Sequence, residues 1–228
     1  ERPEKPVLKR NLKNWFVPES LAVSEVLDGA AVMASDFRIN PAGHMRMVAF
    51  VSPGTDERRV GRIVQRLCEI ETYKSMSMLG FARVRELSGP MGEIEGRLNV
   101  LMAQITRGDT PPEETLEALL QSSAELENMI AASSFRFGAT GAYEAIVNQR
   151  VEVLRERRYC GRQNFADFMM RRYDPAMRTV ASTKRRMEAL ANRAMRAGEL
   201  LRTKVDVTRS AQNQALLESM DRRADMAL

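Results

Sequence analysis

The pattern of apolar and polar residues along the chain changes once, just after its first fifty residues. Before that point two apolar runs, 30–39 and 44–51, flank the tetrapeptide Asn-Pro-Ala-Gly at 40–43, which has Asn, Pro and Gly at the positions they favour in a type I turn. The pattern predicts a β-hairpin. Its second strand, 45–51, is nearly all apolar, so we expect both of its faces to be covered. Because a lone hairpin is only marginally stable, we expect it to extend a larger sheet or to lie under helices, with any missing strands before the first residue.

The N-terminal end of the chain carries Pro3, Pro6 and Pro18 among scattered lysines, a composition typical of an extended arm or linker. Together with the hairpin it predicts an N-terminal region over 1–53. The remainder, 54–228, is predicted to be a helical bundle or coiled-coil region.

After the hairpin, apolar residues recur every three to four positions, the period of an amphipathic helix. Thr55 can cap a first helix, whose apolar stripe is interrupted near Gly80 and ends at Gly89 and Pro90. A shorter helix is predicted over 91–106.

The next helix opens on a capping box, with Thr110 at the N-cap, Pro111 at the first helical position and Glu113 at the third. We expect this helix to be weakened or bent at Gly138 and Gly141.

The last start signal is Asp174 followed by Pro175, again an N-cap and a first-position proline. It predicts a long C-terminal helix, the stalk, over about 175–226. The seam of this helix has a spacing near 3.5 and is rich in small and polar residues: Met187, Leu190, Ala194, Ala197, Leu201, Val205, Thr208, Gln212 and Ala215. Such a seam favours antiparallel packing against the 112–158 helix, or a bundle of helices in an oligomer, over a simple dimeric zipper.

The predicted fold class is therefore mainly α, with long antiparallel coiled-coil-like helices, a long C-terminal stalk helix and a small N-terminal β-hairpin that is the remnant of an α+β arrangement. The chain begins at Glu1 without an initiator Met and ends without a helix-stopping Gly or Pro. We interpret it as a fragment of a longer protein.

Residues that commonly build catalytic or metal sites are scarce. There is one His, and Cys68 and Cys160 are 92 positions apart, whereas zinc and redox sites use closely paired ligands. We predict a non-enzymatic protein with no catalytic residues, no cofactor and no metal site, in which both cysteines are small buried hydrophobes. His44, with Asp36 on the opposing strand, is the last candidate for a catalytic base. The charged side chains of the first long helix predict a surface ion-pair set: Arg62, Arg66, Glu69 and Glu71.

Charge is unevenly placed along the chain. Residues 1–149 hold 17 basic and 20 acidic residues, whereas residues 150–228 hold 18 and 10. A basic segment of this kind favours an anionic membrane surface or an acidic partner, and it is equally expected of a solvated helix face, because Lys and Arg are ordinary helix formers. No aromatic residue follows Tyr173 to stack on a base, so we expect no specific nucleic acid. No run approaches the roughly 18 apolar residues that a membrane-spanning helix needs, and this piece of the chain is expected to be soluble.

Four blocks of sequence together resemble a bacterial domain-of-unknown-function family of inner-membrane-anchored helical proteins. They are SDFRINPAGH (35–44), VGRIVQRL (60–67) with EIETY (69–73), FRFGAT (135–140) with Tyr143, and LLRTKVDV (200–207) with NQALL (213–217) and MDRRA (220–224). The resemblance covers most of the chain from about Ala30 onward and brings no known reaction or ligand.

In that family the Asp-Arg-Arg-Ala phrase precedes a short polar stretch and then membrane-spanning sequence. The resemblance implies that this chain is the soluble portion of a member, on the cytoplasmic side of the bacterial inner membrane, attached through sequence beyond its C-terminus. Arg222 and Arg223 would then be membrane-proximal basic residues close to anionic lipid head groups.

The leading interpretation is a non-enzymatic cytoplasmic scaffold or regulatory stalk of a membrane-anchored bacterial protein, forming a homo-oligomer. The alternative is the cytoplasmic sensory domain of a CorA-like ion-transport protein, in which carboxylates at helix contacts bind a divalent cation. That analogy is architectural only. Nucleic-acid binding through 150–228 and an enzyme with His44 as its base rank below both.

Overall fold

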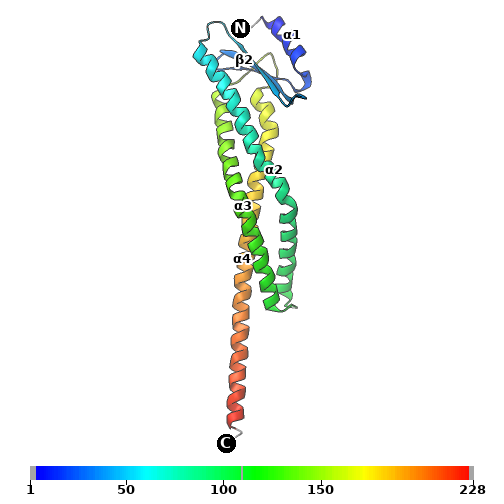
Figure 1. Cartoon of the computed structure of the whole chain (residues 1–228), viewed down its shortest axis with the longest axis vertical. Helices are drawn as coiled ribbons and strands as arrows, with labels where there is room; N and C mark the ends of the chain where they lie inside the picture. The colour runs from blue at the N-terminus through cyan, green and yellow to red at the C-terminus, as the bar shows by residue number, and fades with distance from the viewer. Residues whose placement is uncertain (1–3, 109, 226–228) are drawn as a thin grey trace. The chain divides into compact units, whose positions relative to one another are not determined.

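The computed structural model describes residues 4–108 and 110–225, without the side chains of Pro6 and of residues 221–225. The elements follow in the order α1 (Lys5–Trp15), the 3-10 helix η1 (Pro18–Ser20), β1 (Ala22–Val26), β2 (Ala31–Ile39), β3 (Met45–Val51), α2 (Glu57–Arg107), α3 (Pro112–Val153), β4 (Arg157–Arg158) and α4 (Phe165–Asp225) (Figure 1). The predicted fold class, mainly α with a long C-terminal helix and a small N-terminal antiparallel sheet, is confirmed.

Contacts between residues divide the chain into two compact units. The head unit comprises Glu1–Ala82 and Arg136–Val180, and the helical unit comprises Arg83–Phe135 and Ala181–Leu228. The three long helices each contribute one segment to each unit. The boundary that the sequence suggests between 53 and 54 stays a prediction.

The head unit holds an antiparallel sheet with the strand order β3-β2-β1-β4. The predicted hairpin is confirmed: Asn40 and His44 close the turn through an N–H···O bond of 2.9 Å, and Gly43 adopts a φ of +83°. Among the described residues, β1 and β4 extend this hairpin, and the expectation of strands before the first residue stays a prediction. β4 pairs with β1 through Ser24 opposite Arg158.

The strand covered on both faces is β2, not β3 as the apolar run at 45–51 suggested. The first six residues of β2 are all buried, whereas in β3 only Phe50 is buried and Arg46 is exposed. The reason is position in the sheet. β3 forms an edge, so neighbouring elements cover it less completely than they cover the central β2.

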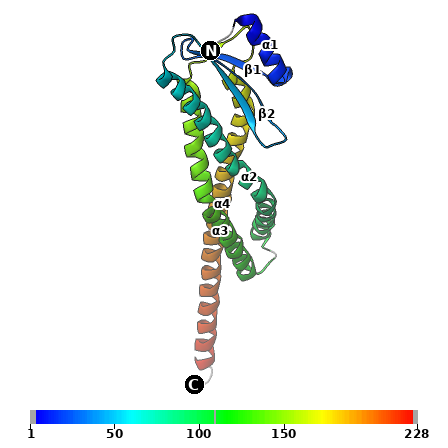
Figure 2. The same cartoon turned by 45° about the horizontal axis from the view of Figure 1, so that its top comes forward.

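Residues 5–15 form the helix α1, and the expectation of an extended arm at this end was wrong. Leu8 and Leu12 lie one turn apart and are both buried, with Phe16 one turn further along, so one face of α1 is apolar although lysines surround it. This face covers one side of the sheet (Figures 1 and 2). The resulting core consists of Leu8, Leu12, Phe16, Leu21, Val23, Val32, Ala34, Phe50 and Tyr159.

Helix α4 begins at Phe165, and the start predicted at Asp174 and Pro175 was wrong. Ser24 and Glu156 hold its first turn: the Phe165 N–H donates to Ser24 Oγ at 2.8 Å, and that hydroxyl donates to Glu156 Oε2 at 2.8 Å. The Ala166 N–H donates to the same carboxylate oxygen at 3.1 Å. A side chain ahead of the helix therefore satisfies main-chain donors that would otherwise be unpaired.

The stop signals predicted inside α2 also fail, because α2 continues through Gly80, Gly89 and Pro90. Proline removes one helical hydrogen bond, at a cost of about 3 kcal/mol, which packing on either side can offset. Buried residues follow the 3-4 spacing straight across Pro90. Gly80 serves a different purpose, since a Cβ there would lie 2.1 Å from Thr140 Oγ1 on α3. It permits close approach of two helices.

Helix α3 starts at Pro112, one residue later than the capping box at Thr110 and Pro111 predicts. The Thr115 N–H donates to the carbonyl of Pro111 at 3.3 Å, so Pro111 occupies the cap and Pro112 the first helical position. No break occurs at Gly138 or Gly141, and the helix runs unbroken to Val153.

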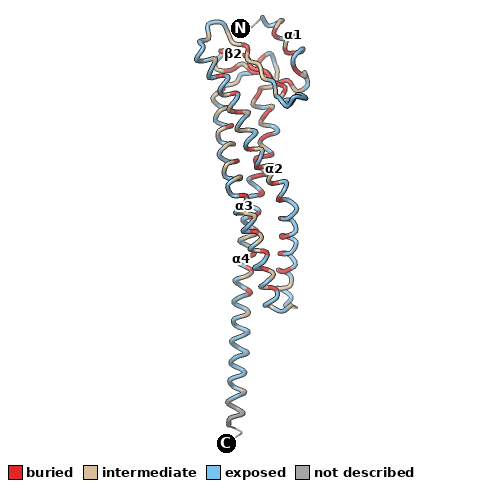
Figure 3. The backbone as a smooth tube through the Cα atoms, viewed as in Figure 1, coloured by how far each residue is buried: buried red, intermediate tan, exposed pale blue. Residues whose placement is uncertain are grey.

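The core of the helical unit is a three-helix seam with alternating spacings of three and four residues, as in coiled coils (Figure 3). The buried apolar residues are Val84, Leu87, Met91, Ile94, Leu98 and Leu101 on α2, Leu119 and Leu126 on α3, and Met187, Leu190, Ala194, Ala197 and Leu201 on α4. Ion pairs at the rim join Arg97 to Glu125 and Arg186 to Glu95.

Candidate interaction surface

The seam predicted for the C-terminal helix divides into two halves. Its first five members, from Met187 to Leu201, are buried in the helical unit. Its last four are not: Val205 is half-buried, and Thr208, Gln212 and Ala215 are exposed. The first half packs within the helical unit as predicted. The second half has no packing partner among the described residues, and its packing in an oligomer, the alternative that the sequence left open, stays a prediction.

We call residues 202–220 the outer segment of α4. Among its described side chains none is buried, and large apolar ones stand in water: Val207 is 64% exposed, Leu216 60%, Leu217 63% and Met220 59% (Figure 3). Most of the stability of a helix in a protein comes from packing of its apolar face, and the outer segment lacks such packing among the described residues. The outer segment therefore has the character of a surface that pairs with something else.

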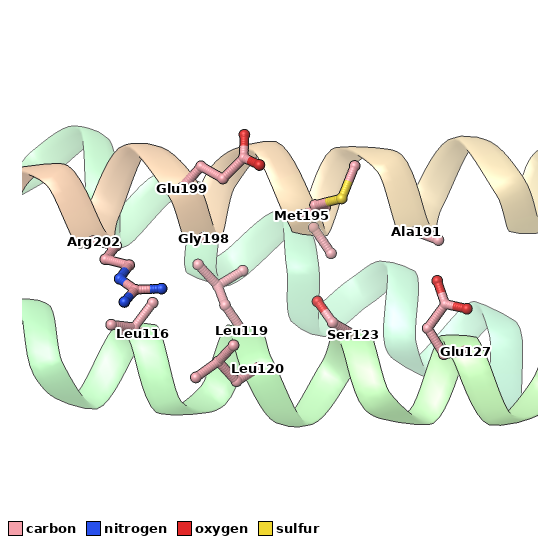
Figure 4. A pocket seen from close by; sticks show the side chains of 11 residues that line it. Leu116, Leu119, Leu120, Ser123, Glu127, Ala191, Met195, Gly198, Glu199 and Arg202 are labelled. Carbon is pink, nitrogen blue, oxygen red and sulfur yellow. The ribbon is translucent and has the colours of Figure 1, made fainter.

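A groove of about 420 Å³ lies next to this segment, between α3 and α4 (Figure 4). Leu116 and Leu120 form its α3 wall, while α4 contributes the small residues Ala191 and Gly198. The side chains of these two residues are too small to fill the space, and Leu120 is left 61% exposed. The residues that complete the groove are Leu119, Ser123, Glu127, Ala194, Met195, Glu199 and Arg202. Its mostly apolar lining suits an apolar side chain better than a charged ligand.

The groove was not found from the sequence. The small residues on α4 were noted only as permitting close helix approach. A groove forms where small side chains on one helix lie opposite long side chains on the other. Which residues lie opposite one another depends on how each helix is rotated about its own axis, and the sequence alone does not give that rotation.

His44 and Asp36, the candidate catalytic pair, both line one surface hollow of about 360 Å³. Asp36 uses Oδ2 to accept the Val17 N–H at 3.1 Å and Oδ1 to accept the Arg38 N–H at 3.2 Å. No hydrogen bond or ion pair joins His44 to Asp36 in the part of the chain that the structure describes, and His44 is exposed.

Both cysteines, Cys68 and Cys160, are exposed free thiols, so the expectation that they are buried hydrophobes was wrong. Cys160 sits in a tight turn with a φ of +50°, and Cys68 lies on the outer face of α2.

The charged set predicted on α2 is only partly an ion-pair set. Glu69 does accept hydrogen bonds, from Gln65 one turn earlier and from Arg150 on α3. These bonds hold the pKa of Glu69 below its ordinary value, with the Gln65 bond the largest cause. Arg62 and Arg66 take part in none of the ion pairs among the described residues.

Carboxylates at helix contacts, the basis of the cation-sensor alternative, are represented by Glu144 on α3 and Asp174 on α4. Burial, and secondarily the charge of Asp174, raises the pKa of Glu144. Within residues 4–108 and 110–225, no group of three or more His, Cys, Asp or Glu side chains could hold a metal ion. That alternative stays a prediction.

The side chains of Arg222 and Arg223 lie outside the described residues, so their predicted position near a membrane is not tested. None of the described helices contains a stretch long and apolar enough to cross a lipid bilayer.

Comparison with family models matches residues 2–228 to a family described as "Protein of unknown function (DUF3422)". The match spans nearly the whole chain and confirms that a domain-of-unknown-function family covers it. The comparisons with curated proteins and with solved structures found no match.

Proposed function

We propose that this chain, which belongs to the DUF3422 family, is a non-enzymatic helical scaffold or regulatory stalk that works by self-association through α4. The observation that carries the proposal is the outer segment of α4, whose large apolar side chains have no partner among the described residues. The adjacent groove beside Leu120 adds a second uncovered apolar surface.

A second copy of the chain is the partner that supplies a matching helix. Two outer segments can bury Val207, Leu217 and Met220 against each other and so remove apolar area from water. Because those side chains alternate with polar ones such as Thr208 and Gln214, the resulting interface would be weaker than a leucine zipper and dependent on concentration. That property suits a regulatory stalk.

Light scattering of the chain during gel filtration tests this proposal. We expect an oligomer whose mass rises with concentration, and a monomer after the double substitution Val207→Glu and Leu217→Glu, because each places a charge in an apolar contact. The matched control, Gln212→Glu with Ser219→Glu, adds the same charge on the opposite face of the same segment and should keep the oligomer. A monomer for the unmodified chain at every concentration would refute self-association.

We further propose that the protein acts on the cytoplasmic side of the bacterial inner membrane. The support is the family resemblance and the basic excess over residues 150–228, which favours anionic lipid head groups. Fractionation of cells expressing the full-length gene tests this. We expect the product in the membrane pellet and its retention there after a high-salt wash. A product found wholly in the soluble fraction contradicts the proposal.

A further inference from the structure

A second hollow, on the head unit, is lined mainly by arginines. It has a volume of about 180 Å³, and its lining includes Arg59, Arg62, Arg66 and Arg155 together with Asp28. We call it the arginine hollow. It shares no residue with the groove between α3 and α4.

Local structure brings these side chains together. Arg59, Arg62 and Arg66 are spaced by three and four residues, which places them on one face of the first turns of α2. Arg155 comes from the turn that follows α3 and has a φ of +47°.

The opposite wall of the hollow is the turn between β1 and β2. There Leu27 and Asp28 have φ values of +50° and +57°, and the Leu27 N–H donates to the Leu154 carbonyl at 2.9 Å. Left-handed backbone in residues other than glycine costs about 1 kcal/mol or more for each residue. Leu27, Asp28 and Arg155 are three such residues, and all three line this one hollow. Local strain of this kind gathers at binding sites.

The positive charge in the hollow is not balanced. Asp28, the lining carboxylate, pairs with Arg155 at 3.1 Å and with Arg157 at 3.6 Å. Arg59, Arg62 and Arg66 take part in none of the ion pairs among the described residues.

Arg66 is half-buried, and its surroundings disfavour its charge. Burial lowers the pKa of Arg66, and the nearby charges of Arg62, Arg150 and Arg155 lower it further. The charge of Glu69 offsets this only in part, and the four lining arginines outnumber Asp28, the one carboxylate among the lining residues, so their mutual repulsion is relieved when an anion binds among them.

We propose that the arginine hollow binds a phosphate group of an anionic ligand. Guanidinium groups match phosphate oxygens with paired hydrogen bonds, and converging arginines favour a multiply charged anion over a single carboxylate. The N-terminus of α2, which begins at Glu57, adds positive potential. The hollow is smaller than the roughly 300–1,000 Å³ of whole small-molecule pockets, so it takes the phosphate and leaves the rest of the ligand outside.

Calorimetric titration of the full chain with inorganic pyrophosphate at low salt tests the site. We expect binding that weakens about tenfold or more in Arg62→Gln and in Arg66→Gln, because each loses a charged hydrogen-bond donor. Arg85→Gln, an exposed arginine further along α2, is the matched control and should leave the affinity unchanged. Both hollow variants should melt at the same temperature as the unmodified chain or higher in the absence of pyrophosphate, since each relieves repulsion.

Two further measurements distinguish a soluble phosphate-containing ligand from a phosphorylated lipid head group. Binding of pyrophosphate without sedimentation on vesicles of phosphatidylcholine containing phosphatidylinositol bisphosphate assigns a soluble ligand. Sedimentation that Arg66→Gln abolishes and Arg85→Gln keeps assigns a lipid head group. The proposal is overturned if the chain binds neither probe, or if Arg62→Gln and Arg66→Gln bind as tightly as the unmodified chain.

Discussion

Gly80→Ala is expected to lower the free energy of unfolding by about 3 kcal/mol, the upper range for forcing extra atoms into a packed core. The added Cβ would lie 2.1 Å from Thr140 Oγ1 and 3.0 Å from both Thr140 Cβ and Cγ2. Thr140 cannot turn away easily, because it is β-branched, buried, and donates its hydroxyl to the Arg136 carbonyl at 2.8 Å. The two helices must therefore separate. Urea unfolding followed by circular dichroism measures the loss.

Gly138→Ala is the matched control for this substitution. Gly138 lies in α3 of the same unit, and a Cβ there meets no atom within 4 Å. It should raise stability by about 0.5–1 kcal/mol through its helix propensity alone. In a Thr140→Ala background, Gly80→Ala should cost less than half as much, because the closest contact is gone. Equal costs in both backgrounds would show that Gly80 is not a packing residue.

Glu156→Ala is expected to lower the free energy of unfolding by about 2–3 kcal/mol, since the Ala166 N–H and the Ser24 hydroxyl lose a half-buried charged acceptor at the start of α4. Glu152→Ala, an exposed carboxylate in the last turn of α3, is the control and should change stability by less than about 0.5 kcal/mol. Chemical unfolding at pH 7 compares the two. A loss for Glu156→Ala no larger than for Glu152→Ala would contradict the capping role.

The same carboxylate predicts a dependence on pH. Burial raises the pKa of Glu156 above its ordinary value of 4.5, although the Ala166 N–H and Ser24 lower it in part. The folded chain then binds this proton more tightly than the unfolded chain. The stability that protonation of Glu156 contributes is therefore lost as the pH rises from about 4.5 through the raised pKa of the folded chain. Glu156→Gln keeps an acceptor oxygen but does not titrate. Its free energy of unfolding should therefore rise relative to that of the unmodified chain as the pH increases from 4.5 to 7. A constant difference would contradict the raised pKa.

The sequence predicted elements whose signals are local and repeated. Apolar residues at helical spacing identified α3, α4 and the helical character of α2, although α2 was predicted as two helices, and the Asn-Pro-Ala-Gly turn identified the hairpin. Individual start and stop signals were misleading at Pro90 and Pro175, because the buried spacing of three and four residues continues on both sides of each proline. Packing along a whole helix outweighs one missing hydrogen bond.

Features that depend on contacts distant in the chain were not predicted. Helix α1 was not predicted, because its prolines and lysines indicate an extended arm. The apolar face formed by Leu8 and Leu12 is short, and it is stabilised only by packing against the sheet. The arginine hollow was hidden for a similar reason. The sequence predicts that Arg66 and Glu69 belong to one set of ion pairs on α2. In the structure Glu69 instead accepts a hydrogen bond from Arg150, 81 positions away, and Arg66 takes part in none of the ion pairs among the described residues.

The pairing of β1 with β4 fixes an order of events during synthesis. Ser24 leaves the ribosome long before its partner Arg158, and Glu156 and Phe165, which bond to its hydroxyl, follow equally late. Until then, β1 presents an open edge that other nascent strands can join. A nascent chain halted before β4 keeps this edge of β1 unpaired, and the time spent in that form is set by the synthesis of α2 and α3, which separate β1 from β4 in the sequence.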